Sequence, residues 1–235
     1  SSGYRKTSII IDVEGDEWDE NIDTGPDLKK EISLSAEEIV KKVGQAGIVG
    51  LGGATFPSHV KLSVPKGKSA DVLIINGVEC EPYLTSDHRL MLEKSEELLV
   101  GTQIIMKALK VKKALIGIER NKPDAIQKLS ELAKEFDGIK VVSLKVKYPQ
   151  GGEKQLIKAL INREVPSGGL PIDVGTVVHN VGTTFAIYEA VQKNKPLVER
   201  VVTVTGKSVK EPCNLWVRVG TPMSEIIKAA GGLPE

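Results

Sequence analysis

The chain has 235 residues, of which 40% are hydrophobic and 27% are charged, and its formal net charge is +1 at pH 7. This composition is typical of a soluble globular protein with one sizeable core or two small ones. The near balance of basic and acidic residues argues against a nucleic-acid partner. Without a polybasic run or a long apolar run, we expect no direct contact with a membrane.

The N-terminus and the cysteines indicate the cellular context. The chain opens on Ser1-Ser2-Gly3, which is typical of a cloning remnant, and no signal peptide follows, so we expect an excised fragment. Cys80 and Cys213 lie far apart and form no metal-ligand pattern, which predicts a reducing compartment, no disulfide framework and no metal site in this chain. We expect the three histidines, which are widely spaced, at the surface or in loops: His59, His88 and His179.

The first elements in chain order are a strand and a helix. Residues 7–13 are rich in β-branched side chains and predict a strand, within an acidic segment that wraps over the surface. Residues 33–43 predict a helix, since Ser35 followed three residues later by Glu38 is typical of a capping box.

A glycine-rich stretch, residues 46–57, follows this helix directly. It contains Gly50, Gly52 and Gly53, and Lys61 comes shortly after it. Glycine at this density predicts either a plain tight loop or a bare backbone whose N–H groups approach an anion or a flat ring. The lysine adds a positive charge beside that loop.

Apolar runs and amphipathic stretches alternate from about residue 70 to residue 193. We expect strands at 71–76, 113–118, 139–146 and 176–180, and helices at 93–109, 123–136, 153–161 and 182–192. This order predicts an α/β fold, a Rossmann-like parallel sheet covered by helices. Ligands bind such sheets beyond the carboxyl ends of the strands, so the loops there should converge on one rim. The glycine-rich stretch must reach that rim from outside the alternation.

The tail has a different pattern. Residues 199–207 predict a strand and a turn, residues 213–219 predict a second strand, and residues 222–230 predict a short helix. Strand, strand and helix suggest the start of a β-grasp module that is truncated before further strands complete it. The expected division is therefore a wrapping segment, a Rossmann-like domain and an incomplete β-grasp module: residues 4–32, 33–195 and 196–235.

Carboxylates stand at two of the expected rim loops. Glu79 and Glu81 flank Cys80 next to a proline, in a loop after a strand, and Glu153 opens a helix after Gly151-Gly152. They are suited to accept hydrogen bonds from a sugar or ribityl chain, and paired acid–base hydrolysis is the competing use. Solvent exposure, or for Glu153 a routine interaction with the helix dipole, remains the alternative.

Other side chains near these loops are weaker candidates for a functional role. Phe56 and Tyr148 are placed to flank a planar ring, although both also suit a core. Ser86, Asp87 and His88 are consecutive, and a catalytic triad is excluded because its members must converge from different directions.

Taken together, the motifs resemble those of a known family. Residues 47–62 resemble the signature of RnfC, a peripheral subunit of the membrane-bound, ion-pumping Rnf complex, which is a ferredoxin:NAD oxidoreductase. Residues 76–83, Asn-Gly-Val-Glu-Cys-Glu-Pro-Tyr, and residues 179–183, His-Asn-Val-Gly-Thr, fit the same family. The resemblance covers about residues 5–235, and RnfC is in turn similar to the flavin- and NADH-binding subunit of respiratory complex I.

The resemblance implies FMN at the rim of the sheet and NADH stacked on its ring. Hydride would pass between NAD(H) and the flavin, which carries the chemistry without a catalytic side chain, and electrons would pass on to iron–sulfur clusters and ferredoxin. The residues that match the cofactor-binding motifs are Gly50, Gly52, Gly53, Lys61, Asn76, Glu79, Glu81, Tyr148, Gly151, Glu153, Asn180 and Thr183.

Two positions depart from the complex I relative. Val78 stands where the relative has an aspartate, and Gly152 stands where it has a glutamate. The tail resembles the family's soluble-ligand-binding (SLBB) β-grasp domain. The segment that holds two 4Fe–4S clusters in the full-length family members is absent, so we expect at most partial activity from this fragment.

The implied setting is the cytoplasmic face of the membrane. The chain would be peripheral there, with NADH and the other Rnf subunits as partners, ferredoxin reached indirectly, and the membrane contacted only through the complex. Two alternatives remain at this stage: a cobalamin-reductase-like flavoprotein that shares the module, and a non-catalytic docking module with a vestigial flavin site.

Overall fold

The computed structural model describes residues 11 and 13–233. The strand expected at residues 7–13 falls mostly outside the described residues, and Ile11 and Val13 themselves are not in a strand. From residue 13 to the first helix the chain has no regular element, and it lies against the rest of the molecule through contacts such as the bond from the Lys29 N–H to the Tyr188 hydroxyl (3.1 Å).

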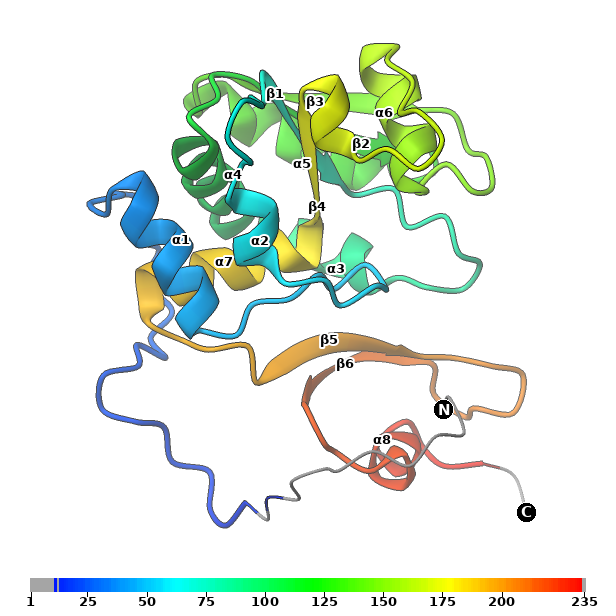
Figure 1. Ribbon diagram of the computed structural model, residues 1–235. Helices are drawn as coiled ribbons and strands as arrows, with labels where there is room; N and C mark the ends of the chain where they lie inside the picture. The colour runs from blue at the N-terminus through cyan, green and yellow to red at the C-terminus, as the bar shows by residue number, and fades with distance from the viewer. Residues whose placement is uncertain (1–10, 12, 234–235) are drawn as a thin grey trace.

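A four-stranded parallel sheet forms the centre of the molecule (Figure 1). Its strands are β1 (Val72–Asn76), β2 (Ala114–Glu119), β3 (Ile139–Leu144) and β4 (Thr176–Asn180), in the order β3-β2-β1-β4. The two central strands are almost entirely buried, as expected for a sheet covered on both faces. The Rossmann-like α/β prediction is confirmed.

Helices cover the two faces unequally. The main core packs α1 (Ala36–Gln45), α4 (Ser95–Leu109), α5 (Pro123–Leu132) and α7 (Val181–Lys193) on one face, together with Leu73 and Ile75 of β1. A smaller core packs α6 (Glu153–Ile161) on the other face, against Ile74 and Val178. Alternate residues of one strand thus serve two cores. Short helical turns complete the chain: α2 (Ser58–Leu62), η1 (Ala133–Glu135) and η2 (Pro171–Val174).

Most of the expected elements are present, but α2 and the helix before α4 were not predicted. The capping box of α1 is confirmed, since Ser35 and Glu38 bond each other's backbone N–H. The helix expected at 93–109 is α4, which begins two residues later at Ser95, and α3 (Ser86–Glu93) precedes it, because the chain leaves helical geometry at Lys94 between the two helices. The helix expected at 123–136 ends earlier as α5 and continues as η1, and the strand expected at 139–146 is shorter. The strand and turn expected at 199–207 are present, since a turn follows the end of β5.

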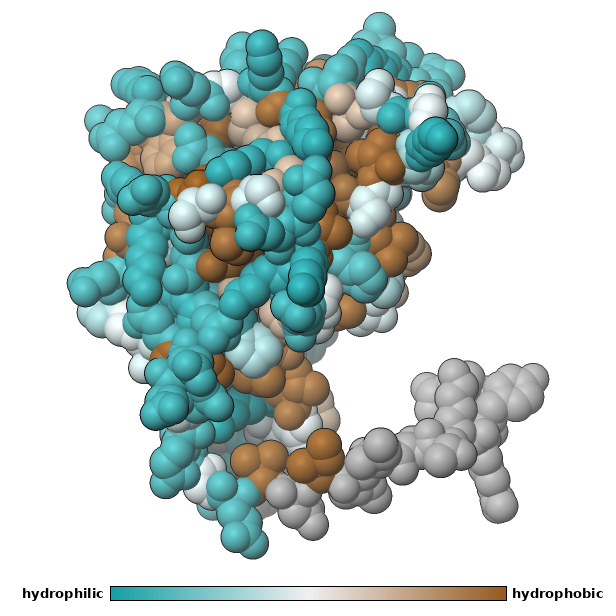
Figure 2. Space-filling view, turned by 60° about the vertical axis from the view of Figure 1, so that its left-hand side comes forward, coloured by the Kyte–Doolittle hydropathy of each residue, from teal (hydrophilic) through white to brown (hydrophobic). Residues whose placement is uncertain are grey.

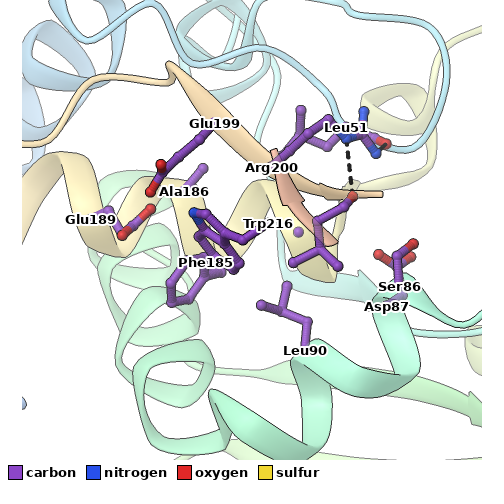
Figure 3. Close-up of a pocket in the computed structure, with 12 residues that line it drawn as sticks. Leu51, Ser86, Asp87, Leu90, Phe185, Ala186, Glu189, Glu199, Arg200 and Trp216 are labelled. Atoms are coloured by element: carbon purple, nitrogen blue, oxygen red, sulfur yellow. Dashed lines mark hydrogen bonds between the residues drawn. The ribbon is translucent and has the colours of Figure 1, made fainter. Parts of the chain in front are cut away.

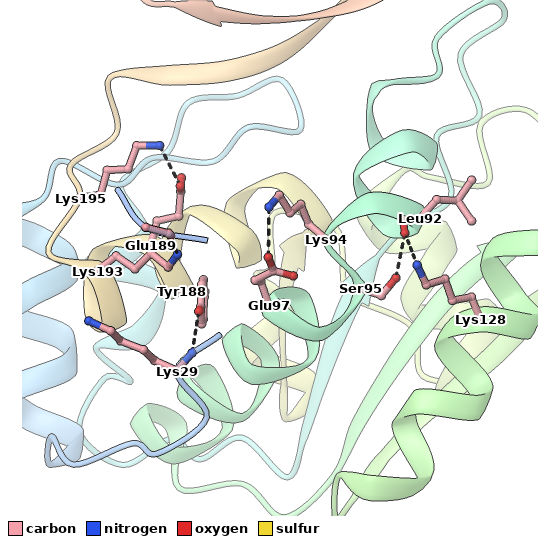
Figure 4. A network of polar contacts seen from close by, with 11 residues as sticks. Lys29, Leu92, Lys94, Ser95, Glu97, Lys128, Tyr188, Glu189, Lys193 and Lys195 are labelled. Carbon is pink, nitrogen blue, oxygen red and sulfur yellow. Dashed lines mark hydrogen bonds and ion pairs between the residues drawn. The ribbon is translucent and has the colours of Figure 1, made fainter. Parts of the chain in front are cut away.

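The tail forms a hairpin beside the rim. Strands β5 (Glu199–Val204) and β6 (Cys213–Arg218) pair antiparallel, and α8 (Met223–Ala229) packs on them, with Val204 and Ile226 buried between. In Figure 1 the hairpin runs below α7 and α3. Lys195, just before the hairpin, pairs with Glu189 of α7 (2.9 Å; Figure 4) and with Glu199 of β5, which ties the hairpin to the sheet domain.

The surface agrees with the composition. The face in Figure 2 is largely hydrophilic, with hydrophobic residues in separate patches. Within the described part of the chain, no helix combines the length and the apolar character needed to cross a bilayer.

Candidate functional site

The rim loops converge as the alternation predicted. Asn76 and Asn180 end the neighbouring parallel strands β1 and β4 and lie side by side in register. The Asn76 side chain donates a hydrogen bond from Nδ2 to the Gly151 carbonyl (2.9 Å), which joins the loop after β1 to the loop after β3. Three loops that are far apart in the sequence therefore meet at the carboxyl edge of the sheet.

The glycine-rich stretch reaches this rim from outside the sheet. Val49 and Pro57 form an isolated antiparallel bridge, and the Gly50 N–H bonds the Phe56 carbonyl (2.8 Å), so the residues between them form a closed loop. The Leu51 N–H bonds Oγ1 of the buried Thr183 (2.8 Å), at the start of α7. This bond anchors the loop beside the carboxyl end of β4.

Two of the glycines have a geometric requirement. A Cβ on Gly52 would lie 3.2 Å from Cβ of Asn180, which is too close for ordinary packing, and Gly53 has φ +130°, a region that side chains rarely adopt. At Gly50 a Cβ would meet only ordinary contacts. The loop thus approaches Asn180 through a bare backbone at Gly52.

Asn180 is fixed by its own side chain. Its Oδ1 accepts the Gly182 N–H (2.8 Å) and the Thr183 N–H (3.3 Å), so it is the N-cap of α7. Its Nδ2 donates to Asp87 Oδ2 (2.6 Å). With both ends bonded, Asn180 has little freedom to move away from the glycine loop.

Lys61 and Glu153 form an ion pair at the rim. Lys61 Nζ lies 2.8 Å from Glu153 Oε1 and donates to the Val178 carbonyl of β4 (3.0 Å). Both side chains are half-buried, and they come from α2 and from the first turn of α6. The two charges that the sequence placed separately are therefore one unit in the structure.

Glu79 and Glu81 diverge and have different environments. Glu79 has φ +47°, and its carboxylate accepts the N–H groups of Asp87 (2.7 Å) and His88 (3.1 Å), which are orphan donors at the start of α3. Glu81 is exposed beside Tyr148, which is also exposed, and its negative charge raises the pKa of the Tyr148 hydroxyl. The Glu79 carboxylate thus caps a helix.

A hollow of about 460 Å³ opens beside these two glutamates. It is lined by polar and aromatic groups from the loop after β1 and from the ends of β2 and β3, including Glu81, Tyr83, Glu119, Lys122 and Tyr148. The hairpin also contacts the rim (Figure 3). Trp216 packs edge-on against Phe185 (5.7 Å between ring centroids), and Arg200 donates to the Leu51 carbonyl (3.2 Å).

Two buried titratable groups were not predicted. Burial and the nearby Glu79 raise the pKa of Asp87 to about 7. Burial and the nearby Lys61 lower the pKa of His179 to about 3. The expectation of a surface or loop position for His179 is wrong, because its side chain lies inside β4 with 3% exposure. The apolar run 176–178 before it was the sequence feature that indicated a buried strand.

The residues present fit a phosphorylated planar cofactor. Lys61 supplies a cation, the Gly52–Gly53 backbone is bare, and Asn76, Asn180 and Gly151 meet at one edge of the sheet. Within the described residues, the backbone N–H groups of Glu79, Cys80 and Glu81 have no acceptor in the protein. Unpaired donors and a cation at the ends of parallel strands are what an anionic ligand requires.

Comparison with known proteins agrees with this geometry. The family model of the Nuo51 FMN-binding domain matches residues 43–189, and the model of the SLBB domain matches residues 201–235. The NAD+-reducing NiFe hydrogenase in its air-oxidized state has a similar structure, with a TM-score of 0.73 at 24% identity over 85% of this chain and 39% of that chain. That likeness shows the fold alone.

The curated relatives belong to ion-translocating complexes. One subunit of the proton-translocating ferredoxin:NAD(+) oxidoreductase complex of Clostridium ljungdahlii is 53% identical over 97% of this chain and 49% of that protein. The corresponding subunit of the Na(+)-translocating complex of Acetobacterium woodii is 46% identical over 99% of this chain and 52% of that protein. The chain spans about half the length of these relatives. The resemblance to RnfC is confirmed, and the chain belongs to the family of Nuo51 FMN-binding domains.

Proposed function

We propose that this chain binds FMN at the rim and exchanges electrons with NAD(H) as part of a ferredoxin:NAD oxidoreductase complex. The observation that carries the proposal is the meeting of the glycine loop, Lys61 and three strand-end loops at one edge, within the region matched by the FMN-binding family model. The relatives are named as subunits of such complexes, which supports the same role here.

Each residue has a distinct part in this proposal. The Gly52–Gly53 backbone admits the ring, Lys61 neutralises negative charge of the cofactor, and Asn76 and Asn180 orient it from the strand ends. Glu81 and Tyr148 stand exposed at the entrance, placed for the nicotinamide nucleotide. Bound FMN would supply the hydride and single-electron chemistry, while the protein supplies position and electrostatics.

Glu79 and Glu153 act indirectly in this arrangement. Glu79 holds α3 in place, and Glu153 holds Lys61 at the rim. Their carboxylates are engaged within the protein, so the hydrogen bonds to a ribityl chain come from the remaining rim groups. The proposed setting is peripheral, at the cytoplasmic face of the membrane, with the other subunits of the complex as partners and iron–sulfur clusters as electron acceptors.

The direct test is reconstitution of the full chain with FMN. We expect quenching of FMN fluorescence at a ratio of one flavin to one chain, and bleaching of the flavin absorption when NADH is added without oxygen. A folded protein that binds no FMN would exclude this function and would favour a docking module with a vestigial site. Binding of FMN without bleaching would limit the proposal to a flavin-binding unit.

Replacement of Lys61 by methionine is expected to weaken FMN binding at least about tenfold. A hydrogen bond to a charged group contributes roughly 1.5–3 kcal/mol, and about 1.4 kcal/mol corresponds to a factor of ten. The dissociation constant is read from fluorescence quenching. Lys68→Met, which removes a similar lysine–carboxylate pair with Asp173 away from the rim, is the control and should bind as the parent does. Equal affinities for all three proteins would contradict the role of Lys61.

A further inference from the structure

A buried lysine supports the loop that carries Glu79. Lys122 is only 6% exposed, and its Nζ donates to the carbonyls of Val78 (2.8 Å) and Glu79 (3.3 Å). Lys122 follows β2 and is the N-cap residue of α5, so it contacts this loop from the connection after the neighbouring strand. Neither the glycine motif nor the carboxylate motif contains it.

The two peptide groups held by Lys122 are trans. Neither peptide group is cis in the described chain. In a trans peptide the N–H points opposite to the carbonyl, so the Glu79 N–H is opposite to the Val78 carbonyl, and the Cys80 N–H is opposite to the Glu79 carbonyl. Both N–H groups therefore point away from Lys122. Among the described residues neither has an acceptor, and the left-handed conformation of Glu79 is of the kind that groups successive N–H donors into an anion-binding nest.

The sheet places Lys122 and the candidate site on different sides of β1. Lys122 lies on the β2 side of β1, whereas β4, Asn180 and the glycine loop lie on the other side. The N–H groups that point away from Lys122 are not engaged by the β2 side, which leaves them available to a ligand at the rim. An ammonium that bonds a carbonyl also polarises the N–H at the other end of the same peptide, which makes it a stronger donor.

We propose that Lys122 is a positioning residue that tunes bound FMN through these two peptide groups. The proposal rests on the proposed function. Reduced FMN carries more negative charge on its ring than oxidised FMN, so polarised N–H donors stabilise the reduced form more. Lys122 thereby raises the midpoint potential of the flavin without touching it.

A purely structural role for Lys122 predicts a different result. A lysine that only holds the loop in place would favour the binding of oxidised and of reduced FMN equally. Its loss would weaken the binding of both forms to the same extent. Lys122→Gln separates the two roles, because the amide still donates to a carbonyl but carries no charge. Lys122→Met removes both the bond and the charge.

The experiment measures FMN binding and flavin midpoint potential on the full chain, by fluorescence quenching and by anaerobic titration with a redox dye. We expect both variants to weaken the binding of reduced FMN about tenfold more than the binding of oxidised FMN. This difference lowers the midpoint potential of the flavin by about 30 mV for a two-electron couple. Lys122→Arg, which keeps the charge, should restore the parent potential. Thermal unfolding of each variant checks that the loop remains folded.

The matched control is Lys128→Met. Lys128 also donates to a backbone carbonyl, that of Leu92 (2.6 Å; Figure 4), but lies on the exposed side of α5. It should leave the potential unchanged. A potential equal to that of the parent in Lys122→Gln would overturn the inference and leave the proposed function intact. Failure of the parent itself to bind FMN would overturn both. If the methionine variant does not fold, the glutamine variant decides.

Discussion

Gly52→Leu is expected to abolish FMN binding while the protein stays folded. A side chain at this position would meet Asn180, whose Cβ lies 3.2 Å from the place of the new Cβ. Asn180 cannot retreat without losing the cap of α7 and its bond to Asp87. The glycine loop must therefore move, and the leucine occupies the space that we assign to the cofactor. We expect a loss in affinity of at least a hundredfold, equivalent to about 2.8 kcal/mol.

The fold should tolerate this change. Gly52 is exposed and is not among the glycines with positive φ, so leucine introduces no backbone strain there. Urea unfolding should show a shift below about 1 kcal/mol, as is usual for exposed sites. Ser69→Leu adds similar bulk on an exposed loop away from the rim and should bind FMN normally. Undiminished binding by Gly52→Leu would contradict the placement of the cofactor against this loop.

The second large effect is a pair of opposed pH dependences. His179 has an ordinary pKa of 6.5 when unfolded and about 3 when folded, so the unfolded chain binds more protons between these values. The stabilising contribution of His179 to the free energy of unfolding is complete above pH 6.5 and is lost as the pH falls toward 3. Asp87 has an ordinary pKa of 3.8 and about 7 when folded, so the folded chain binds more protons there. Its contribution is complete below pH 3.8 and is lost as the pH rises through 7.

Between pH 4 and 6.5 the two contributions oppose each other, and single variants should separate them. Asp87→Asn leaves only the contribution of His179. The free energy of unfolding of this variant should fall relative to that of the parent on acidification, by up to about 1.4 kcal/mol for each pH unit. His179→Phe leaves only the contribution of Asp87, so its free energy of unfolding should rise relative to that of the parent on acidification. Urea unfolding at several pH values measures both. Variant curves parallel to the parent curve would contradict the assigned pKa shifts.

Local sequence determined most of the secondary structure and the order of the strands in the chain. The short apolar runs that form β1 and β2 predicted buried strands correctly, because residues of both faces are apolar along most of each run. The capping box of α1 is likewise a short-range arrangement and was predicted correctly. Alternation of strands and helices then fixed the parallel sheet and the convergence of the loops at its carboxyl edge.

The start of α3 was not predictable from its own residues. The donors of its first turn are capped by the Glu79 carboxylate, which lies outside the helix and reaches it through the left-handed turn at Glu79. The burial of His179 was missed for a related reason. The run 176–178 indicated a buried strand, but whether the polar side chain that follows the run is also covered depends on the elements that pack against β4.

The sequence by itself determined the fold class, the family resemblance and the residue types at the rim, since these depend on periodicity and short motifs. Only the tertiary structure decided which side chains act together. Lys61 pairs with Glu153, which lies far away in the sequence, and Lys122 contacts the loop after β1 from the connection that follows β2. The glycine loop meets Asn180 only after the sheet has formed. Each of these contacts joins segments that the chain separates widely, so its energy depends on the assembled sheet and not on any local pattern.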